Sequence, residues 1–140
     1  MKNKYNILLN YIKDLSIEIP SAQTLIYARD NISKYSMNID ISSKVLKDKM
    51  IEVVTKLTYS NKLEEKNKTF FEIQYASIVT IQDDKIQKKE LEKIILCDLQ
   101  IEIYPKLEEI FLKILRDAGL QDLKFEKKID FKDLYNKKYN

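Results

Sequence analysis

The stretch from Met50 to Ile81, MIEVVTKLTYSNKLEEKNKTFFEIQYASIVTI, alternates between apolar and polar residues on both sides of a polar segment. In its first half the odd-numbered positions are apolar apart from Thr55, and only Val54 breaks the polar series. A period of two places alternate side chains on opposite faces of a strand. The stretch therefore predicts two long strands, each with its odd-numbered residues on one face, joined by a solvated loop at Asn61–Lys68.

A first strand is expected from Tyr11 to Ile19, where Pro20 ends it because proline removes a ladder donor. Residues 1–10 are a short leader that pairs as an extra edge strand or stays loose. Lys13 interrupts the alternation near the start of this strand. One predicted face carries Tyr11, Leu15, Ile17 and Ile19, and the other carries Ile12, Asp14, Ser16 and Glu18.

A second strand is expected from Tyr35 to Val45, after an irregular crossover at Ser21–Ser36 in which one helical turn is possible. Lys47, Asp48 and Lys49 form the turn into the central hairpin. Because consecutive strands on short loops pair with their neighbours, the four strands predict one antiparallel sheet.

Helices follow the strands. Lys88–Leu99 has apolar residues at helical spacing, whereas Leu99–Ile103 alternates like a strand or a linker. A second helix is expected at Pro105–Ala118, with Pro105 in its first turn and Gly119 as its stop. An extended piece then leads to a short last helix that Asp130 caps. The predicted fold is α+β, a four-stranded antiparallel sheet with two main helices packed on one face, in one domain over residues 1–140.

Composition limits the function. The 140 residues contain no histidine and one cysteine, Cys97, which excludes histidine-dependent nucleophilic sites and cysteine-cluster metal sites. No run of 18 apolar residues and no signal peptide is visible, so the expected compartment is the cytoplasm. A carboxylate-only metal site or a glycosidase-type site stays open in principle, but the acidic residues are scattered, without a D-x-D loop or a Gly-rich phosphate cradle. We expect no catalytic residues, no metal and no cofactor: a binding protein and not an enzyme.

The net charge of +3 leaves a small basic nucleic-acid-binding domain as an alternative. Lysines mix with acids along the chain and outnumber them only near the end. No nucleic-acid-binding motif accompanies them, so a solvated basic tail is the simpler interpretation. The lysines concerned are Lys124, Lys127, Lys128, Lys132, Lys137 and Lys138.

Four ordered motifs resemble the SecB family of protein-export chaperones. Tyr11–Pro20 (YIKDLSIEIP) resembles the family's Y-x-K-D-[IL]-S-F-E-x-P, and Glu52–Val54 (EVV) with Thr69–Gln74 (TFFEIQ) resembles E-V-V and F-L-x-E-V-Q at the same separation. Tyr104 and Pro105 resemble F-P-Y-A-R-E, and Ile129–Tyr135 (IDFKDLY) resembles V-N-F-D-A-L-F. The resemblance covers nearly the whole chain. Family members are usually strongly acidic, whereas this chain is slightly basic.

The resemblance implies a dimer of dimers, a homotetramer, that acts as an ATP-independent holdase. Such a chaperone binds unfolded preproteins and delivers them to the SecA motor, without inserting into the membrane. Positions that match the family's SecA contacts are Asp14, Glu18, Phe70 and Glu72, provided that the last two lie on the same sheet face as the first two. The helix at Pro105–Ala118, or the one before it, is expected to form the oligomer.

A holdase needs a long apolar surface without strict polar geometry, because burial of apolar area is favourable whatever the client's sequence. SecB-like chaperones also occur with toxin–antitoxin systems, where the client is an antitoxin, and this alternative stays open. Candidate residues for the client groove are Tyr35, Met37 and Ile39 on the second strand, Tyr104 at the helix entry, and Leu134 and Tyr135 on the last helix.

Overall fold

The computed structural model describes residues 4–61 and 68–139, so most of the predicted Asn61–Lys68 loop lies outside the described residues. The α+β class with an antiparallel four-stranded sheet is confirmed. In chain order the elements are β1 (Tyr5–Glu18), α1 (Ala22–Asp30), a 3-10 turn η1 (Ile32–Lys34), β2 (Ser36–Val45), β3 (Met50–Ser60), β4 (Phe70–Ile81), α2 (Lys88–Lys93), a π-helical segment η2 (Ile94–Asp98), α3 (Leu99–Asp117) and α4 (Phe131–Tyr139).

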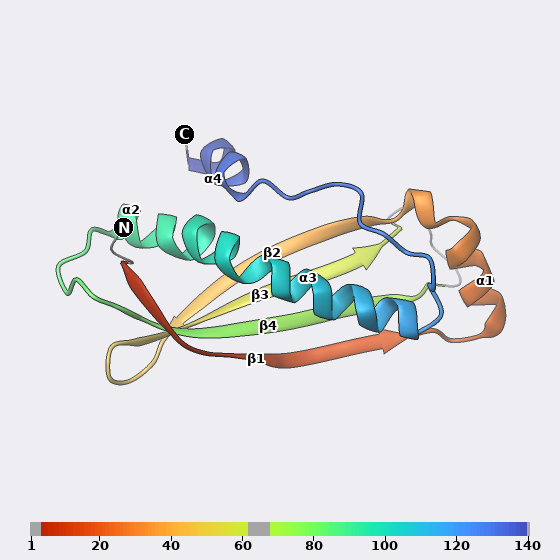
Figure 1. Cartoon of the computed structure of the whole chain (residues 1–140), viewed down its shortest axis with the longest axis horizontal. Helices are drawn as coiled ribbons and strands as arrows, with labels where there is room; N and C mark the ends of the chain where they lie inside the picture. The colour runs from red at the N-terminus through yellow and green to blue at the C-terminus, as the bar shows by residue number, and fades with distance from the viewer. Residues whose placement is uncertain (1–3, 62–67, 140) are drawn as a thin grey trace.

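The strand order is β1-β4-β3-β2, with every neighbouring pair antiparallel, so β1 and β2 are the edge strands. The continuous run α2–η2–α3 lies across one face of the sheet, and α1 sits at the far end (Figure 1). After α3 the chain turns back along the sheet toward α4 (Figure 1). The opposite face of the sheet, called the outer face below, carries the even-numbered residues of β3 and β4.

The central hairpin forms as predicted. β3 and β4 pair with Thr55 opposite Tyr75 and Leu57 opposite Ile73. Odd-numbered side chains on both strands are buried under the helices, and Leu57, Phe71 and Ile73 are each 0% exposed. This alternation therefore decides which side of the sheet receives the helices.

β1 is longer than expected. It begins at Tyr5, so residues 5–10 belong to the same strand and form neither a separate strand nor a loose leader. Tyr5 pairs with Ile81 and Glu18 with Phe70, which makes β1 the full-length neighbour of β4. The pairing skips Leu8, which forms a β-bulge. The bulge keeps β1 in contact with β4 although the alternation of β1 is irregular.

A second bulge corrects the predicted facing of β1. The pairing also skips Lys13, with Tyr11 opposite Ala76 and Ile12 opposite Tyr75. Tyr11 therefore lies on the outer face and Ile12 on the helix side, the reverse of the prediction. The reason is that a bulge adds one residue to one strand and shifts the alternation on one side of it. The irregular position of Lys13 in the sequence marks this bulge.

The crossover predicted at Ser21–Ser36 is wrong in part, because a nine-residue helix, α1, forms there. The Ser21 side chain caps it by accepting a hydrogen bond from the Thr24 amide at 3.1 Å. Leu25 of α1 packs against the end of α3: a Cβ at Gly119 would lie 2.9 Å from Leu25 Cδ1. Gly119 has φ +131°, so this position suits glycine both in backbone angle and in space.

The two predicted helices at Lys88–Leu99 and Pro105–Ala118 are one uninterrupted helical run. The strand-like alternation at Leu99–Ile103 is helical, and Pro105 lies inside α3 and not in a first turn. A proline inside a helix leaves the carbonyl four residues earlier without its usual partner. Here that residue is Ile101, which is 46% exposed, so water can satisfy its carbonyl and the helix continues.

A buried polar contact accompanies the π-helical segment. Gln100, 0% exposed, donates from Nε2 to the Ile95 carbonyl at 3.1 Å. Its Oε1 accepts a hydrogen bond from Thr55 Oγ1 at 2.9 Å. The contact links the centre of β3 to the start of α3 and fixes the rotation of the helix over the sheet. π-helical turns are uncommon and often mark such local requirements.

The last helix begins as predicted. The Asp130 carboxylate accepts a hydrogen bond from the Asp133 amide at 3.0 Å, which is the geometry of an N-cap. Phe131, 4% exposed, inserts into the core and holds the start of α4 against α3. None of the described helices is long and apolar enough to span a membrane.

Candidate functional site

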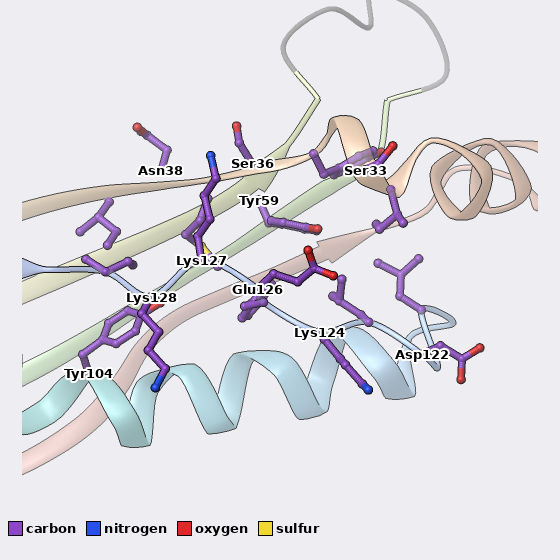
Figure 2. A pocket seen from close by; sticks show the side chains of 18 of the residues that line it. Ser33, Ser36, Asn38, Tyr59, Tyr104, Asp122, Lys124, Glu126, Lys127 and Lys128 are labelled. Carbon is purple, nitrogen blue, oxygen red and sulfur yellow. The ribbon is translucent and has the colours of Figure 1, made fainter.

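A groove of about 1170 Å³ opens between α1, the first half of β2 and residues 120–130, a segment called the strap below. Figure 2 shows the strap running between α3 and the strands, with Lys127 and Lys128 pointing to opposite sides of it. Five of the six predicted client residues line this groove, although they were predicted on three separate elements. They are Tyr35, Met37, Ile39, Tyr104 and Leu134.

These residues contribute in two ways. Met37 and Ile39 are half-buried and Leu134 is 49% exposed, so their side chains offer apolar surface to a ligand. Tyr35 and Tyr104 are each 8% exposed and form walls. The Tyr35 ring lies 5.3 Å from the Tyr59 ring. Accessible aliphatic surface on stiff aromatic walls suits ligands with apolar side chains of varied shape.

The walls are electrically neutral at physiological pH. Burial raises the pKa of Tyr59 to about 12, with a smaller contribution from Tyr35. Burial, followed by the nearby Glu108 carboxylate, also raises the pKa of Tyr104. Phenol groups with such pKa values keep their protons, so Tyr59 and Tyr104 present no charge to a ligand in the groove.

The sixth predicted residue, Tyr135, lies outside the groove. It is 9% exposed, and its hydroxyl donates to the Lys89 carbonyl at 3.5 Å. This contact holds α4 against α2. The two residues are 46 positions apart in the sequence, so the helical spacing of α4 alone does not predict the contact. Tyr135 therefore positions α4, whereas its neighbour Leu134 faces the groove.

Sequence reasoning named five of the residues that line the groove and missed the others, among them two apolar ones, Ile26 and Phe125. Ile26 of α1 is 56% exposed and lines the groove, and Phe125 of the strap also lines it. Ser21 followed by Thr24 is a capping signal that indicates a helix carrying Ile26. Phe125 is the one aromatic residue in the polar run from Lys124 to Lys128, an isolated apolar residue that predicts a contact.

Charges of both signs alternate along the rim of the groove. Lys124, Lys127 and Lys128 of the strap are interspersed with Asp122 and Glu126. Further along, on α4, Lys137 forms an ion pair with Asp133 at 3.0 Å. The lysines near the chain end therefore lie among acids, an arrangement unlike the continuous basic stripe typical of nucleic-acid-binding domains.

The outer face brings together the four residues predicted for partner binding. Glu18 is opposite Phe70 in the β1–β4 register, and Ser16 is opposite Glu72. Asp14 follows on the same face, opposite Gln74. Because directly opposed residues in an antiparallel pair share a face, Glu18 and Glu72 lie next to Phe70, which is 39% exposed, and Asp14 lies on the same face four residue pairs along the strands. We call these four residues the acidic patch.

The acidic patch carries uncompensated charge. Within the described chain none of its three carboxylates has an ion-pair partner. The Glu72 carboxylate accepts one hydrogen bond from the Thr58 hydroxyl at 3.4 Å. Phe70 also borders a hollow of about 400 Å³. The arrangement combines free negative charge with an aromatic side chain that another chain can cover.

The other half of the outer face contains a charged cluster that the sequence did not predict. Glu52, 9% exposed, accepts hydrogen bonds from Lys13 Nζ at 2.6 Å and from the Tyr11 hydroxyl. The bonds from Lys13 and then Tyr11 lower the pKa of Glu52 below its ordinary value of 4.5. The Lys13 bulge makes this cluster possible, because it turns Tyr11 to the outer face. The cluster joins β1 to β3 across β4.

Nothing in the described residues forms a group of three or more cysteine, aspartate and glutamate side chains that could hold a metal ion. The single cysteine, Cys97, is buried on η2, and burial raises the pKa of its thiol.

Comparisons with known proteins agree with this architecture. The whole chain, residues 1–140, matches the family described as preprotein translocase subunit SecB. A Pelagibacter ubique protein provisionally named as the protein-export protein SecB is 51% identical over 140 residues, which cover 100% of both chains. The protein-export protein SecB of Rickettsia typhi is 31% identical over 91% of this chain and 83% of its own.

A solved structure has a similar fold. The SecB-like chaperone of Mycobacterium tuberculosis, in complex with a ChAD peptide from the HigA1 antitoxin, superposes with a TM-score of 0.64. The two sequences are 12% identical, and the superposition covers 88% of this chain and 86% of that one. At this identity the likeness concerns the fold.

Proposed function

The chain belongs to the SecB family of protein-export chaperones, and from this we propose that it is an ATP-independent holdase of the cytoplasm that binds unfolded preproteins and delivers them to SecA. The observation that carries the proposal is the groove. It offers apolar side chains from α1, β2 and α4 around neutral aromatic walls.

The groove fits a client that is recognised by composition and not by sequence. Burial of apolar surface contributes about 25 cal/mol per Å² whatever the residue order. Met37 and Ile39 supply that surface at the β2 edge of the sheet, and Leu134 supplies it from α4. No nucleotide-binding motif appears in the sequence, in accord with binding and release without ATP.

The acidic patch suits a basic segment of SecA. Asp14, Glu18 and Glu72 attract a positively charged partner and raise its rate of encounter, and Phe70 adds an apolar anchor. The patch and the groove lie on opposite sides of the sheet. A preprotein in the groove therefore leaves the patch free for SecA.

We further propose a homotetramer. Four apolar residues of the edge strand β1 are 40–52% exposed, and Ile101 of α3 is 46% exposed. Burial of such surface between subunits stabilises an oligomer. Light scattering is expected to give the mass of four chains at micromolar concentration, and a strict monomer would contradict this part of the proposal. The exposed residues on β1 are Leu8, Leu9, Ile12 and Leu15.

The holdase proposal is tested by aggregation of a chemically unfolded client, followed by light scattering without ATP. The wild-type protein is expected to suppress aggregation. Met37→Asp, which places a charge in the groove, is expected to abolish suppression. Val45→Asp is the matched control, because Val45 lies on the same strand, is 76% exposed and does not line the groove. If the wild-type protein does not suppress aggregation, the holdase proposal fails.

A second candidate is a chaperone of a toxin–antitoxin system. It is supported by the similar fold of the Mycobacterium tuberculosis protein that was solved with an antitoxin peptide. The relatives named for protein export support the first candidate over it. Binding assays with a preprotein segment and with an antitoxin from the same genome separate the two candidates. The true client binds the groove and slows the exchange of backbone amide hydrogens around Met37 with solvent.

A further inference from the structure

The strap occupies part of the groove with one of its own side chains. Phe125 is half-buried, and its ring meets the Tyr59 ring edge-on at 5.3 Å. On its other side the ring lies 6.4 Å from Phe111, which is 0% exposed. Phe125 thus completes a row of rings that continues through Tyr59 to Tyr35 at 5.3 Å. The row crosses the groove from the core of α3 to the edge of the sheet.

The strap is fixed on both sides of Phe125. Before it, Leu123 is 6% exposed and its carbonyl accepts a hydrogen bond from Arg116 Nε at 2.8 Å. After it, Phe131 is 4% exposed and its ring lies 5.3 Å from the Tyr104 ring. Segments on both sides of residue 125 therefore stay attached to α3 whether or not the Phe125 side chain occupies the groove.

Between these anchors few contacts hold the backbone in place. Residues 124–129 form neither helix nor strand, and in the described chain they make no backbone–backbone hydrogen bond. Lys124 and Glu126, the neighbours of Phe125, are both exposed. An extended backbone with one apolar side chain in the groove and polar residues beside it has the form of a bound unfolded peptide.

We propose that Phe125 is an intramolecular competitor of the client: it fills the aromatic site at Tyr59 when the groove is empty, and an apolar client side chain displaces it. The inference rests on the groove being the client site, as proposed above. Displacement breaks no backbone hydrogen bond in residues 124–129, so its cost is limited to the contacts of one ring. The client ring then makes the same contacts in its place.

The competition predicts the direction in which client affinity changes when the Phe125 ring is removed. When a site is competent in only a fraction of molecules, the apparent affinity falls by that fraction. Removal of the Phe125 ring by Phe125→Ala is therefore expected to tighten binding, by about tenfold if the ring occupies the site in nine molecules of ten. A residue that merely forms part of the groove wall would have the opposite effect, because its loss removes client contacts. Ile129→Ala is the control, a half-buried residue that lines the groove from the same strap without a ring contact.

Tryptophan fluorescence tests displacement directly, because the chain contains no Trp. The probe is a short unfolded peptide that contains Phe but no Trp, added to full-length Phe125→Trp and, separately, to full-length Leu134→Trp. Emission of the variant at residue 125 is expected to shift to the red as the indole leaves the groove. Emission of the variant at residue 134, on the exposed wall, is expected to shift to the blue as the peptide covers it.

The outcomes separate the two proposals. Tighter binding by Phe125→Ala together with the red shift supports competition. Weaker binding by Phe125→Ala, or an unchanged or blue-shifted emission at residue 125 while the peptide binds, overturns it. If the peptide and unfolded clients do not bind the wild-type protein at all, measured by anisotropy of a labelled peptide, the holdase function itself fails. Urea unfolding of each variant shows whether it is folded. If Phe125→Ala is unfolded, the fluorescence test with Phe125→Trp still decides the proposal.

Discussion

Thr55→Val tests the hydrogen bond that fixes the helical run over the sheet. Thr55 and Gln100 are both 0% exposed, and the bond between them is 2.9 Å long. Valine has nearly the same shape, so the substitution leaves Gln100 Oε1 buried without its donor. An unsatisfied buried acceptor costs about 1–3 kcal/mol. The added methyl group returns at most about 0.8 kcal/mol. We expect a net loss of about 1 kcal/mol in the free energy of unfolding, within a range of about 0.2–2 kcal/mol.

Urea denaturation followed by circular dichroism measures this loss, with Thr80→Val as the control. Thr80 is a half-buried residue of β4 on the outer face, and its substitution is expected to change the free energy by less than about 0.5 kcal/mol. Adding Gln100→Met to Thr55→Val is expected to restore part of the stability, because replacing both partners by apolar groups removes the unsatisfied atom. The reasoning is refuted if Thr55→Val is as stable as the control.

Three further predictions concern the outer face and the end of α3. Reversing Glu18 and Glu72 to Lys is expected to weaken SecA binding at least about tenfold and to leave client binding unchanged, as measured by calorimetry; survival of both activities would show that the patch is only a solvated surface. The lowered pKa of Glu52 stabilises the fold above pH 4.5, and this stabilisation is lost as the pH falls through the folded-state pKa. Glu52→Gln is therefore expected to destabilise the protein at pH 7 and much less at pH 3 in urea titrations, whereas an equal effect at both pH values would exclude the charged contact with Lys13. Gly119→Ala is expected to lower the free energy of unfolding by about 1–3 kcal/mol, because φ is +131° and a Cβ meets a leucine methyl at 2.9 Å; an unchanged thermal midpoint would contradict it.

The sheet was predictable because one face of each central strand is buried. A one-residue slip in β3 or β4 would expose a whole row of apolar side chains, so the pattern determines the facing. The same rule failed on β1, where Lys13 is a bulge and the strand is at an edge. An edge strand has a neighbour on one side only, so an extra residue is tolerated there. Lys13 interrupts the alternation, but the alternation alone does not show that the interruption is a bulge.

The helices were harder to delimit. Pro105 resembled a helix start because proline is favoured there, and the exposed position of Ile101 that permits an internal proline is a tertiary property. The polar residue Gln100 made its surroundings look strand-like, and its partner Thr55 is 45 residues away in the chain. Spacing within a segment does not show a hydrogen bond of that separation.

The acidic patch was easier to predict from the sequence than the groove, because strand register can be read from the sequence and tertiary packing cannot. The four residues of the acidic patch lie on two paired strands, so the register that alternation sets also brings them together. The groove is assembled from α1, β2, the strap and α4, which are joined only by tertiary packing. Sequence reasoning named Met37 and Ile39 from the strand pattern, and Tyr104 and Leu134 among the helix residues, but it missed Ile26 on α1 and Phe125 on the strap.

The basic net charge does not conflict with an acidic docking surface. Charges are screened over about 8 Å at physiological ionic strength, so a partner that approaches the sheet responds to the side chains on that face. The strap lysines lie with the groove on the helix side, whereas Asp14, Glu18 and Glu72 lie on the outer face without ion-pair partners in the described chain. At the acidic patch itself, the local sign of the field is thus set by where the strands place a few carboxylates. A net charge of +3, summed over the chain, is a poor guide to it.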